Sequence, residues 1–197
     1  MGRKKRDWRS GSYYNVATRG NNKQNLFSQL EDYQEFIEIL IAAHAKFQME
    51  IVAYCIMPNH FHLLIRSDHV HLKDVMHFIN SKYSFYFRKK YGFVGHVYEK
   101  RYYAKLIESL IGVLHISSYI HRNPTATNPP LVQSMENYIF SSFQYYQYHY
   151  LSPPPFLNKS LLPKILPAPY ESSYDGYCKY CKNHFLEKQP NREFVRY

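Results

Sequence analysis

Apolar and polar positions change period several times along the first two thirds of the chain. Tyr13–Arg19 is rich in aromatic and β-branched residues and stops at Gly20, which predicts a strand followed by a turn. Between residues 30 and 47, and again between 72 and 91, apolar residues recur every three or four positions, as on one face of a helix. Gly92 follows the second segment, where glycine commonly ends a helix.

Four further elements complete the pattern. Residues 51–57 and 60–65 read as a hairpin around Pro58 and Asn59, and residues 96–107 as another strand. Residues 109–122 read as a helix that must stop before Pro124. The order strand, helix, strand, strand, helix, strand, helix predicts an α+β fold. We expect a ferredoxin-like or RRM-like antiparallel sheet, with helices packed on one face and the pair His60 and His62 on a central strand.

The ends of the chain differ in composition from this middle part. Residues 1–11 form a basic N-terminal arm, and residues 12–150 form the expected domain, with another helix between 137 and 150. A proline run at residues 153–155 is typical of an extended spacer. Residues 151–197 are therefore expected to be a proline-containing C-terminal tail.

The chain is strongly basic, with a formal net charge of +10 over 197 residues. This balance favours a polyanionic partner such as nucleic acid, and the 21 tyrosines supply rings that can stack on unpaired bases or fill a core. No apolar run approaches the roughly 20 residues of a membrane span, and the basic N-terminus lacks the apolar segment of a secretory signal. We therefore expect a cytoplasmic protein with no membrane partner. Cys178 and Cys181 have CxxC spacing but too few neighbouring ligands for a zinc site, so reduced thiols are expected.

Two histidines interrupt the apolar hairpin. In a strand, alternate side chains share a face, so His60 and His62 project together, roughly 7 Å apart, and can hold one ion. Such spacing also occurs in pairs of surface histidines. On the helix before Pro124, Tyr119 and Asn123 are four residues apart and lie on one face, where His115 also lies, whereas His121 points away.

These segments resemble a known family when they are taken together. Met57-Pro-Asn-His-Phe-His-Leu-Leu-Ile65 and Tyr119-Ile-His-Arg-Asn-Pro124, with Thr18-Arg-Gly-Asn21 before them and Gly95-His-Val-Tyr98 between them, resemble the single-tyrosine HUH transposases. The branch concerned is that of the REP-associated tyrosine transposases, within the IS200-like superfamily. The resemblance runs from about residue 13 to 142. Asn15 and Phe140 depart from it, where many relatives have His and Trp.

The resemblance implies a bacterial metal-dependent endonuclease and strand transferase for single-stranded or hairpin DNA, working through a 5′-phosphotyrosine. In it, His60, His62 and Asn123 hold a divalent cation, Mg²⁺ or Mn²⁺, and Tyr119 is the nucleophile. A monomer or a homodimer is compatible with the sequence. Contacts to DNA phosphates are expected from basic side chains in three places, namely Arg3, Lys4, Lys5, Arg6, Arg19, Lys100 and Arg101.

Three alternatives remain at this point. A rolling-circle replication initiator or a relaxase uses the same HUH chemistry. A basic, aromatic-rich module of this fold can also hold RNA or single-stranded DNA without cutting it. A structural or storage protein for metal ions would bind the cation and leave DNA intact.

Overall fold

A computed structural model describes residues 8–183, so Arg3, Lys4, Lys5 and Arg6 of the expected DNA contacts lie outside the described residues. This part of the chain forms four strands and six α-helices, with short 3₁₀ turns at Asn21–Lys23, Asn123–Thr125 and Met135–Asn137. The elements are β1 (Tyr13–Arg19), α1 (Leu30–Phe47), β2 (Glu50–Met57), β3 (His60–Arg66), α2 (Leu72–Tyr91), β4 (Tyr103–Ile107), α3 (Leu110–Arg122), α4 (Phe143–Gln147), α5 (Leu161–Lys164) and α6 (Tyr174–Asn183).

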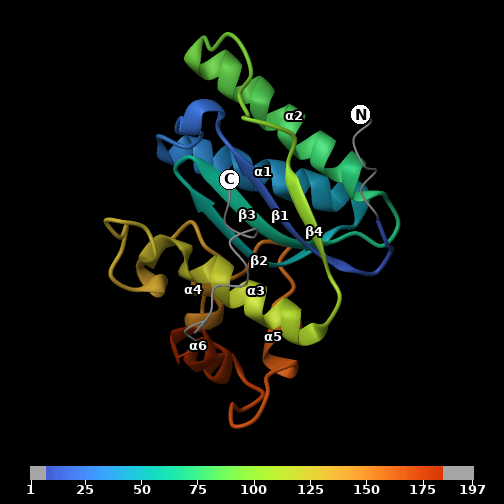
Figure 1. Ribbon diagram of the computed structural model, residues 1–197, viewed down its shortest axis with the longest axis vertical. Coiled ribbons are helices and arrows are strands. Elements are labelled where there is room, and N and C mark those ends of the chain that lie inside the picture. Colours follow the sequence, from blue (N-terminus) through green and yellow to red (C-terminus); the bar gives the residue numbers. More distant parts are fainter. Residues whose placement is uncertain (1–7, 184–197) are drawn as a thin grey trace.

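The four strands form one antiparallel sheet in the order β2-β3-β1-β4. This is the order expected when two βαβ units interleave in a ferredoxin-like fold. β3, which carries both histidines, lies between β2 and β1, so the histidines are on a central strand (Figure 1). The predicted α+β class and antiparallel sheet are confirmed.

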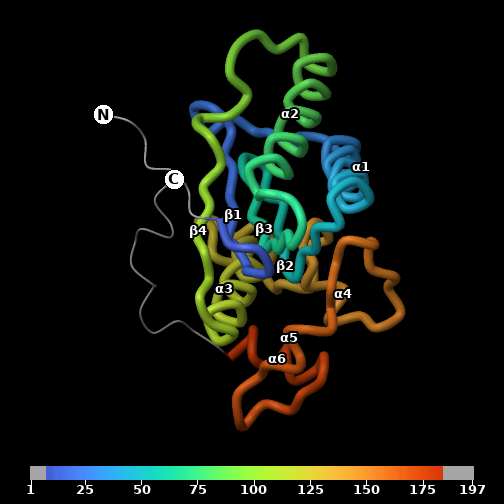
Figure 2. Tube along the Cα trace, turned by 90° about the vertical axis from the view of Figure 1, so that its right-hand side faces the viewer, coloured from blue at the N-terminus to red at the C-terminus, as the bar shows by residue number. Residues whose placement is uncertain are grey.

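Helices cover both faces of the sheet, which corrects the expectation that they pack on one face. Phe61, Leu63 and Ile65 lie in one apolar cluster with α1 and α2, whereas Leu64 and Cys55 lie in a second cluster with α3 (Figure 2). The physical reason is that β2 and β3 are apolar on both sides, so each face of their pairing must be covered. The histidine face is therefore an interior face beneath α3.

Local signals explain where the main helices begin and end. α1 begins with a capping box between Gln29 and Asp32. α2 ends at Gly92, whose φ of 60° lies in the left-handed region that glycine adopts readily. α3 begins where the Ser109 hydroxyl accepts a hydrogen bond from the Gly112 amide, and Pro124 follows its last turn.

The C-terminal part is more ordered than the sequence indicates. Residues 156–183, expected to belong to an extended tail, pack against the domain. Phe156 is fully buried, and its carbonyl accepts a hydrogen bond from the Ile51 amide of β2. Tyr177 and Cys181 of α6 are fully buried in the same cluster as α3. The expectation fails because an amphipathic ten-residue helix beyond a proline run can reach back to the core.

Two element boundaries also differ from the prediction. The expected helix over residues 137–150 is reduced to α4, after a short 3₁₀ turn. The expected strand over residues 96–107 forms a ladder only in β4, while Tyr98 makes a single bridge to Gly20. No helix within residues 8–183 is both long and apolar enough to cross a membrane.

Candidate active site

His60 and His62 lie side by side on the face of β3 that α3 covers. Their ring centroids are 5.1 Å apart and their planes are perpendicular at 89°. His62 is only 1% exposed, and His60 is partly buried at the end of the strand. The alternation of strand side chains thus places two imidazoles in one protected position.

α3 brings Tyr119 to the same position. The Tyr119 ring lies 5.8 Å from the His62 ring, measured between centroids, and is nearly perpendicular to it at 85°. Ile120 and Ile116 anchor α3 in the apolar cluster shared with β2 and β3, which fixes the side of the helix that faces the sheet. The phenol and the imidazoles therefore converge from two elements that are distant in sequence.

Two asparagines make hydrogen bonds at this site. The Asn59 side-chain oxygen lies 2.7 Å from His60 Nδ1, and an Nδ1–H donor in this contact leaves Nε2 free to bind an ion. Asn123 donates its amide to the Tyr119 carbonyl at 2.9 Å and to the Ile120 carbonyl at 3.3 Å. A hydrogen bond with Asn123 raises the pKa of His60 against the effect of burial, so the Asn123 side chain also reaches His60.

Burial sets the protonation of the site. Burial lowers the pKa of His60 to about 4, and the charge of Arg19 adds to this. Burial and the neighbouring His60 lower the pKa of His62 well below its usual range. Both imidazoles are neutral at pH 7 and keep a lone pair for a ligand. Burial also raises the pKa of Tyr119 against an opposing hydrogen bond with Asn123, so its hydroxyl is protonated.

These residues fit a divalent cation. Two neutral imidazoles and an amide oxygen are a donor set that Mn²⁺ and Mg²⁺ accept, leaving further positions for solvent or a phosphate oxygen. Within residues 8–183, no group of three His, Cys, Asp or Glu side chains is arranged to hold a metal ion. His60 and His62 would therefore be completed by a neutral oxygen, for which Asn123 is the candidate.

The described members of the predicted DNA-contact set lie near one end of β1. Arg19 is opposite His60 in the β1–β3 ladder and shares the histidine face. Lys100 and Arg101 are exposed in the segment between α2 and β4. That segment is tied to β1, because the Glu99 amide donates to the Arg19 carbonyl at 3.1 Å. The structure thus places Arg19 beside the histidine pair. Lys100 and Arg101 follow Glu99, the residue that is hydrogen-bonded to Arg19.

Sequence reasoning missed a buried polar network behind Tyr119. His121 lies on the opposite side of α3, where Nε2 is 2.7 Å from the Ser142 hydroxyl and Nδ1 is 2.9 Å from the Tyr177 hydroxyl. Tyr177 also donates to Ser117 at 2.8 Å, and the Tyr54 amide donates to Ser142 at 2.8 Å. The network joins α3 to β2 and α6. The paired serines at residues 141–142 were its one visible signal.

The two cysteines of the CxxC pair lie in the interior, on α6. Cys178 and Cys181 are free and buried on α6, one helical turn apart. Burial raises the pKa of each thiol to about 12. A buried thiol that stays protonated is a poor nucleophile.

The fold and this convergence define an α+β domain with a pair of imidazoles beside a tyrosine. The family model described as "Transposase IS200 like" matches residues 9–123, which include β1 to β4, both histidines, Tyr119 and Asn123. The match covers more than half of the chain, and the chain belongs to this family. No curated protein matches the chain.

Two solved structures match the chain. A REP-associated tyrosine transposase bound to a REP hairpin has a TM-score of 0.63 and 19% sequence identity, over 80% of this chain and 92% of that one. A putative transposase from Deinococcus radiodurans R1 has a TM-score of 0.40 and 18% identity, over 62% of this chain and 97% of that one. At this identity the first likeness supports the fold.

Proposed function

We propose that the protein is a divalent-cation-dependent nicking and joining enzyme for single-stranded DNA that flanks a hairpin. The observation that carries this proposal is the convergence of His60, His62 and Asn123 with Tyr119 at one buried position. Membership of a transposase family and a structural neighbour that is bound to a DNA hairpin support the same class of substrate.

His60, His62 and Asn123 would hold the cation, as the resemblance implies. A bound divalent cation would polarise the scissile phosphate and stabilise negative charge on the departing oxygen. The protein's own contribution is to keep both imidazoles neutral and to engage Nδ1 of His60 through Asn59, which leaves Nε2 for the cation. Arg19, opposite His60, supplies a permanent positive charge for a phosphate at the same place.

Tyr119 would attack the phosphorus atom in line with the departing 3′ oxygen. A bond forms between Tyr119 Oη and phosphorus, the bond from phosphorus to the 3′ oxygen breaks, and the phenolic proton passes through solvent to the 3′ oxygen. The products are a 5′-phosphotyrosine and a free 3′ hydroxyl. One phosphodiester replaces another, so attack by a different 3′ hydroxyl rejoins the strand without a nucleotide cofactor.

The direct test is a search for the covalent intermediate. A hairpin DNA with single-stranded flanks is labelled at its 3′ end in one sample and at its 5′ end in another, incubated with Mn²⁺ and run on a denaturing gel. The 3′ label is expected to migrate with the protein and the 5′ label to remain on a shortened free strand. Labels exchanged between these positions would contradict the proposed polarity.

The matched variants are Tyr119→Phe and Tyr150→Phe. Each removes one hydroxyl, but Tyr150 is 80% exposed and far from the site in sequence. We expect no adduct with Tyr119→Phe and an unchanged amount with Tyr150→Phe. An adduct that survives Tyr119→Phe would place the nucleophile elsewhere. DNA binding without any adduct in the unmodified protein would favour a binding module.

A further inference from the structure

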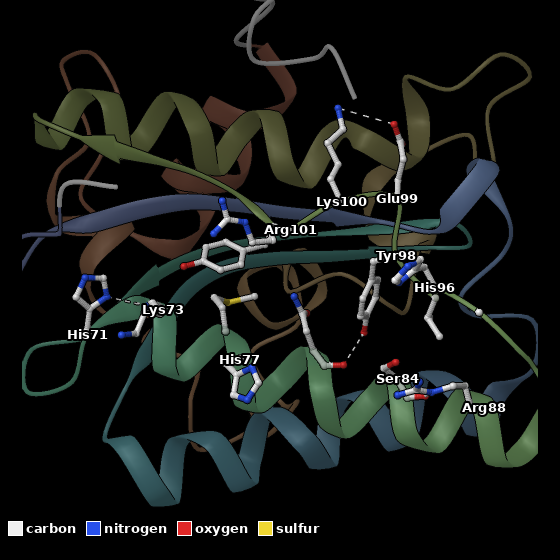
Figure 3. A pocket seen from close by; sticks show the side chains of 15 residues that line it. His71, Lys73, His77, Ser84, Arg88, His96, Tyr98, Glu99, Lys100 and Arg101 are labelled. Atoms are coloured by element: carbon white, nitrogen blue, oxygen red, sulfur yellow. Dashed lines mark hydrogen bonds and ion pairs between the residues drawn. The ribbon is translucent and has the colours of Figure 1, made fainter. Parts of the chain in front are cut away.

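The helix that carries Tyr119, α3, packs against the C-terminal helix α6 as well as against the sheet. Lys100 and Arg101 of the expected DNA contacts line a pocket beside α2, which lies with α1 on one face of the sheet (Figure 3). α6 shares the apolar cluster of α3 on the opposite face. α6 therefore contacts α3 without lining that pocket, and the nicking chemistry does not explain the polar groups buried between the two helices.

The two sides of α3 have different partners. Tyr119 and Asn123, four residues apart, face the histidine pair, whereas Ser117 and His121, also four residues apart, face α6. Tyr119 and His121 are two residues apart, which is a turn of about 200° around the helix. The polar groups that meet α6 thus lie on the far side of α3 from the candidate active site.

A chain of hydrogen bonds runs from β2 toward α6 through His121. The Tyr54 amide, which can only donate, bonds to the Ser142 hydroxyl at 2.8 Å. The Tyr54 carbonyl already accepts the Ser142 amide at 3.0 Å. The Ser142 hydroxyl lies 3.3 Å from that carbonyl but only 2.7 Å from His121 Nε2, so its hydrogen goes to the imidazole. His121 Nε2 is therefore an acceptor.

The other end of the chain lies on α3. The Tyr177 hydroxyl donates to Ser117 Oγ at 2.8 Å, and Ser117 donates in turn to the Leu114 carbonyl at 2.8 Å. A phenol has one hydrogen, so the Tyr177 oxygen accepts from His121 Nδ1, which is 2.9 Å away. Burial lowers the pKa of His121 to about 3, so the ring is neutral. Every donor and acceptor of the chain is used when the one ring proton is on Nδ1.

A second contact joins the two helices at the next residue of α3. Arg122 Nη1 donates to the carbonyls of Cys181 and Lys182 at 2.7 and 3.4 Å. These carbonyls belong to the last turn of α6, where a helix leaves its carbonyls without an internal partner. Arg122 directly precedes Asn123, so this contact holds the end of α3 next to the proposed cation ligand.

Both contacts restrict the rotation of α3 about its own axis. The phenolic oxygen of a tyrosine lies roughly 9 Å from the axis of its helix, so a rotation of about 10° moves it by about 1.5 Å. A displacement of about 1 Å can slow a reaction by roughly 100-fold. Apolar packing has no preferred direction, whereas hydrogen bonds weaken as their angles change. The bonds on the far side of α3 therefore define where Tyr119 lies.

We propose that Tyr177, acting through His121, is a positioning residue that fixes the rotation of α3 and thereby the place of Tyr119 and Asn123. The proposal rests on the proposed function and deepens it, because it makes α6 a requirement of the nicking step. Ser142 and Tyr177 both lie outside residues 9–123, which match the family model. The positioning is thus supplied by a part of the chain that the family match does not include.

The test compares Tyr177→Phe with Tyr146→Phe. Each removes one fully buried hydroxyl from the same cluster, but the Tyr146 hydroxyl donates to the Val52 carbonyl of β2 at 2.7 Å instead of to a group on α3. The rate of adduct formation in Mn²⁺ is measured at saturating hairpin DNA. Anisotropy gives the hairpin affinity of each protein, and thermal unfolding verifies that both variants fold.

We expect Tyr177→Phe to form the adduct about tenfold more slowly, with hairpin affinity within about twofold of the unmodified protein. Tyr146→Phe, which leaves Tyr119 in place, is expected to keep the original rate within about twofold. Equal slowing in the two variants would indicate a general loosening and would overturn the proposal, as would an unchanged rate in Tyr177→Phe. If Tyr177→Phe does not fold, Ser117→Ala removes the partner hydroxyl at a helix position that alanine favours, and the same slowing is expected.

A second measurement is independent of cleavage. In protein with nitrogen-15-labelled histidine, nuclear magnetic resonance identifies the protonated ring nitrogen of His121. We expect Nδ1 in the unmodified protein and Nε2 in Tyr177→Phe, where only the Ser142 partner remains. The His62 signal, which the neighbouring Tyr119 ring shifts, is expected to move in Tyr177→Phe and to stay in Tyr146→Phe. A proton on Nε2 in the unmodified protein, or an unmoved His62 signal, would overturn the proposal.

The positioning role and the nicking activity can fail separately. If no protein forms an adduct but the His62 signal moves in Tyr177→Phe alone, the positioning of Tyr119 stands and the nicking proposal fails. If Tyr177→Phe forms the adduct as fast as the unmodified protein, the nicking proposal stands and α6 only stabilises the domain.

Discussion

The ring of Tyr119 meets the ring of His62 nearly edge to face, at 5.8 Å between centroids and 85° between planes. One side chain comes from a strand of the sheet and the other from a helix that packs over it. Because α3 is anchored in the same apolar cluster as β2 and β3, this relationship is a property of the packed domain. The phenol and the histidine pair therefore have a fixed separation before any DNA arrives.

The first prediction separates cleavage from binding. In the double variant His60→Ala with His62→Ala, nicking in Mn²⁺ is expected to fall by about a thousandfold or more. The two side chains that would hold the cation are gone, so the scissile phosphate is no longer polarised. Hairpin affinity is expected to change by less than about threefold, because the basic residues that supply it remain. Gel assays and anisotropy on the same preparation measure the two effects. Nicking that continues at full rate in EDTA would contradict the metal-dependent mechanism.

The parts of this arrangement that depend on residues close together in the sequence could be predicted, whereas those that depend on long-range packing could not. His60 and His62 could be predicted on one face because strand alternation is local, and α2 was predicted from residue 72 to 91 because its apolar period and Gly92 are local as well. That α3 covers the histidine face was not predictable from periodicity. It depends on which of the two apolar faces of the β2–β3 pair α3 packs against.

The same reasoning explains the missed contacts. Asn59 appears in the sequence as a turn residue, and its bond to His60 becomes visible only once the turn has folded back onto the strand. The sequence predicts that His121 points away from the site, which is correct. Its partners Ser142 and Tyr177, however, lie in segments whose return to the core has no local signature. Long-range polar pairs of this kind are set by tertiary packing.

A second prediction concerns Asn59 as a positioning residue. Replacing it in Asn59→Ala removes the acceptor at 2.7 Å from His60 Nδ1, so the imidazole loses its fixed tautomer and orientation. We expect Mn²⁺ affinity to weaken by about 10-fold to 100-fold, measured by calorimetry without DNA. The Asn59→Asp variant restores an acceptor and is expected to recover most of the loss. Equal affinities in all three proteins would exclude this role.

A third prediction concerns the network that fastens α6 to α3. Tyr177→Phe deletes a fully buried hydroxyl that contacts both Ser117 and His121, leaving these groups without that partner. The free energy of unfolding is expected to fall by about 1 to 3 kcal/mol. Tyr150→Phe, at an exposed position, is expected to change it by less than about 0.5 kcal/mol. Urea unfolding followed by circular dichroism makes the comparison, and equal stabilities would contradict the network's contribution.

The last prediction concerns Asp32, a fully buried carboxylate at the start of α1. Burial alone would raise its pKa, but hydrogen bonds from Lys90, Tyr91 and the backbone of Ser28 and Gln29 outweigh burial and lower it to about 2. The folded pKa lies below the unfolded value of 3.8, so the stabilisation is complete above about pH 4 and is lost as the pH falls toward 2.

The measurement compares the unmodified protein with Asp32→Asn. The difference in their free energies of unfolding is expected to shrink by about 2 kcal/mol between pH 5 and pH 2, since the amide of the variant cannot titrate. The buried histidines lose stabilisation in acid in both proteins and cancel from the difference. A difference that stays constant over this range would mean that Lys90 and its neighbours do not stabilise the charged carboxylate, and the anchoring of α2 to the start of α1 would then depend on apolar packing alone.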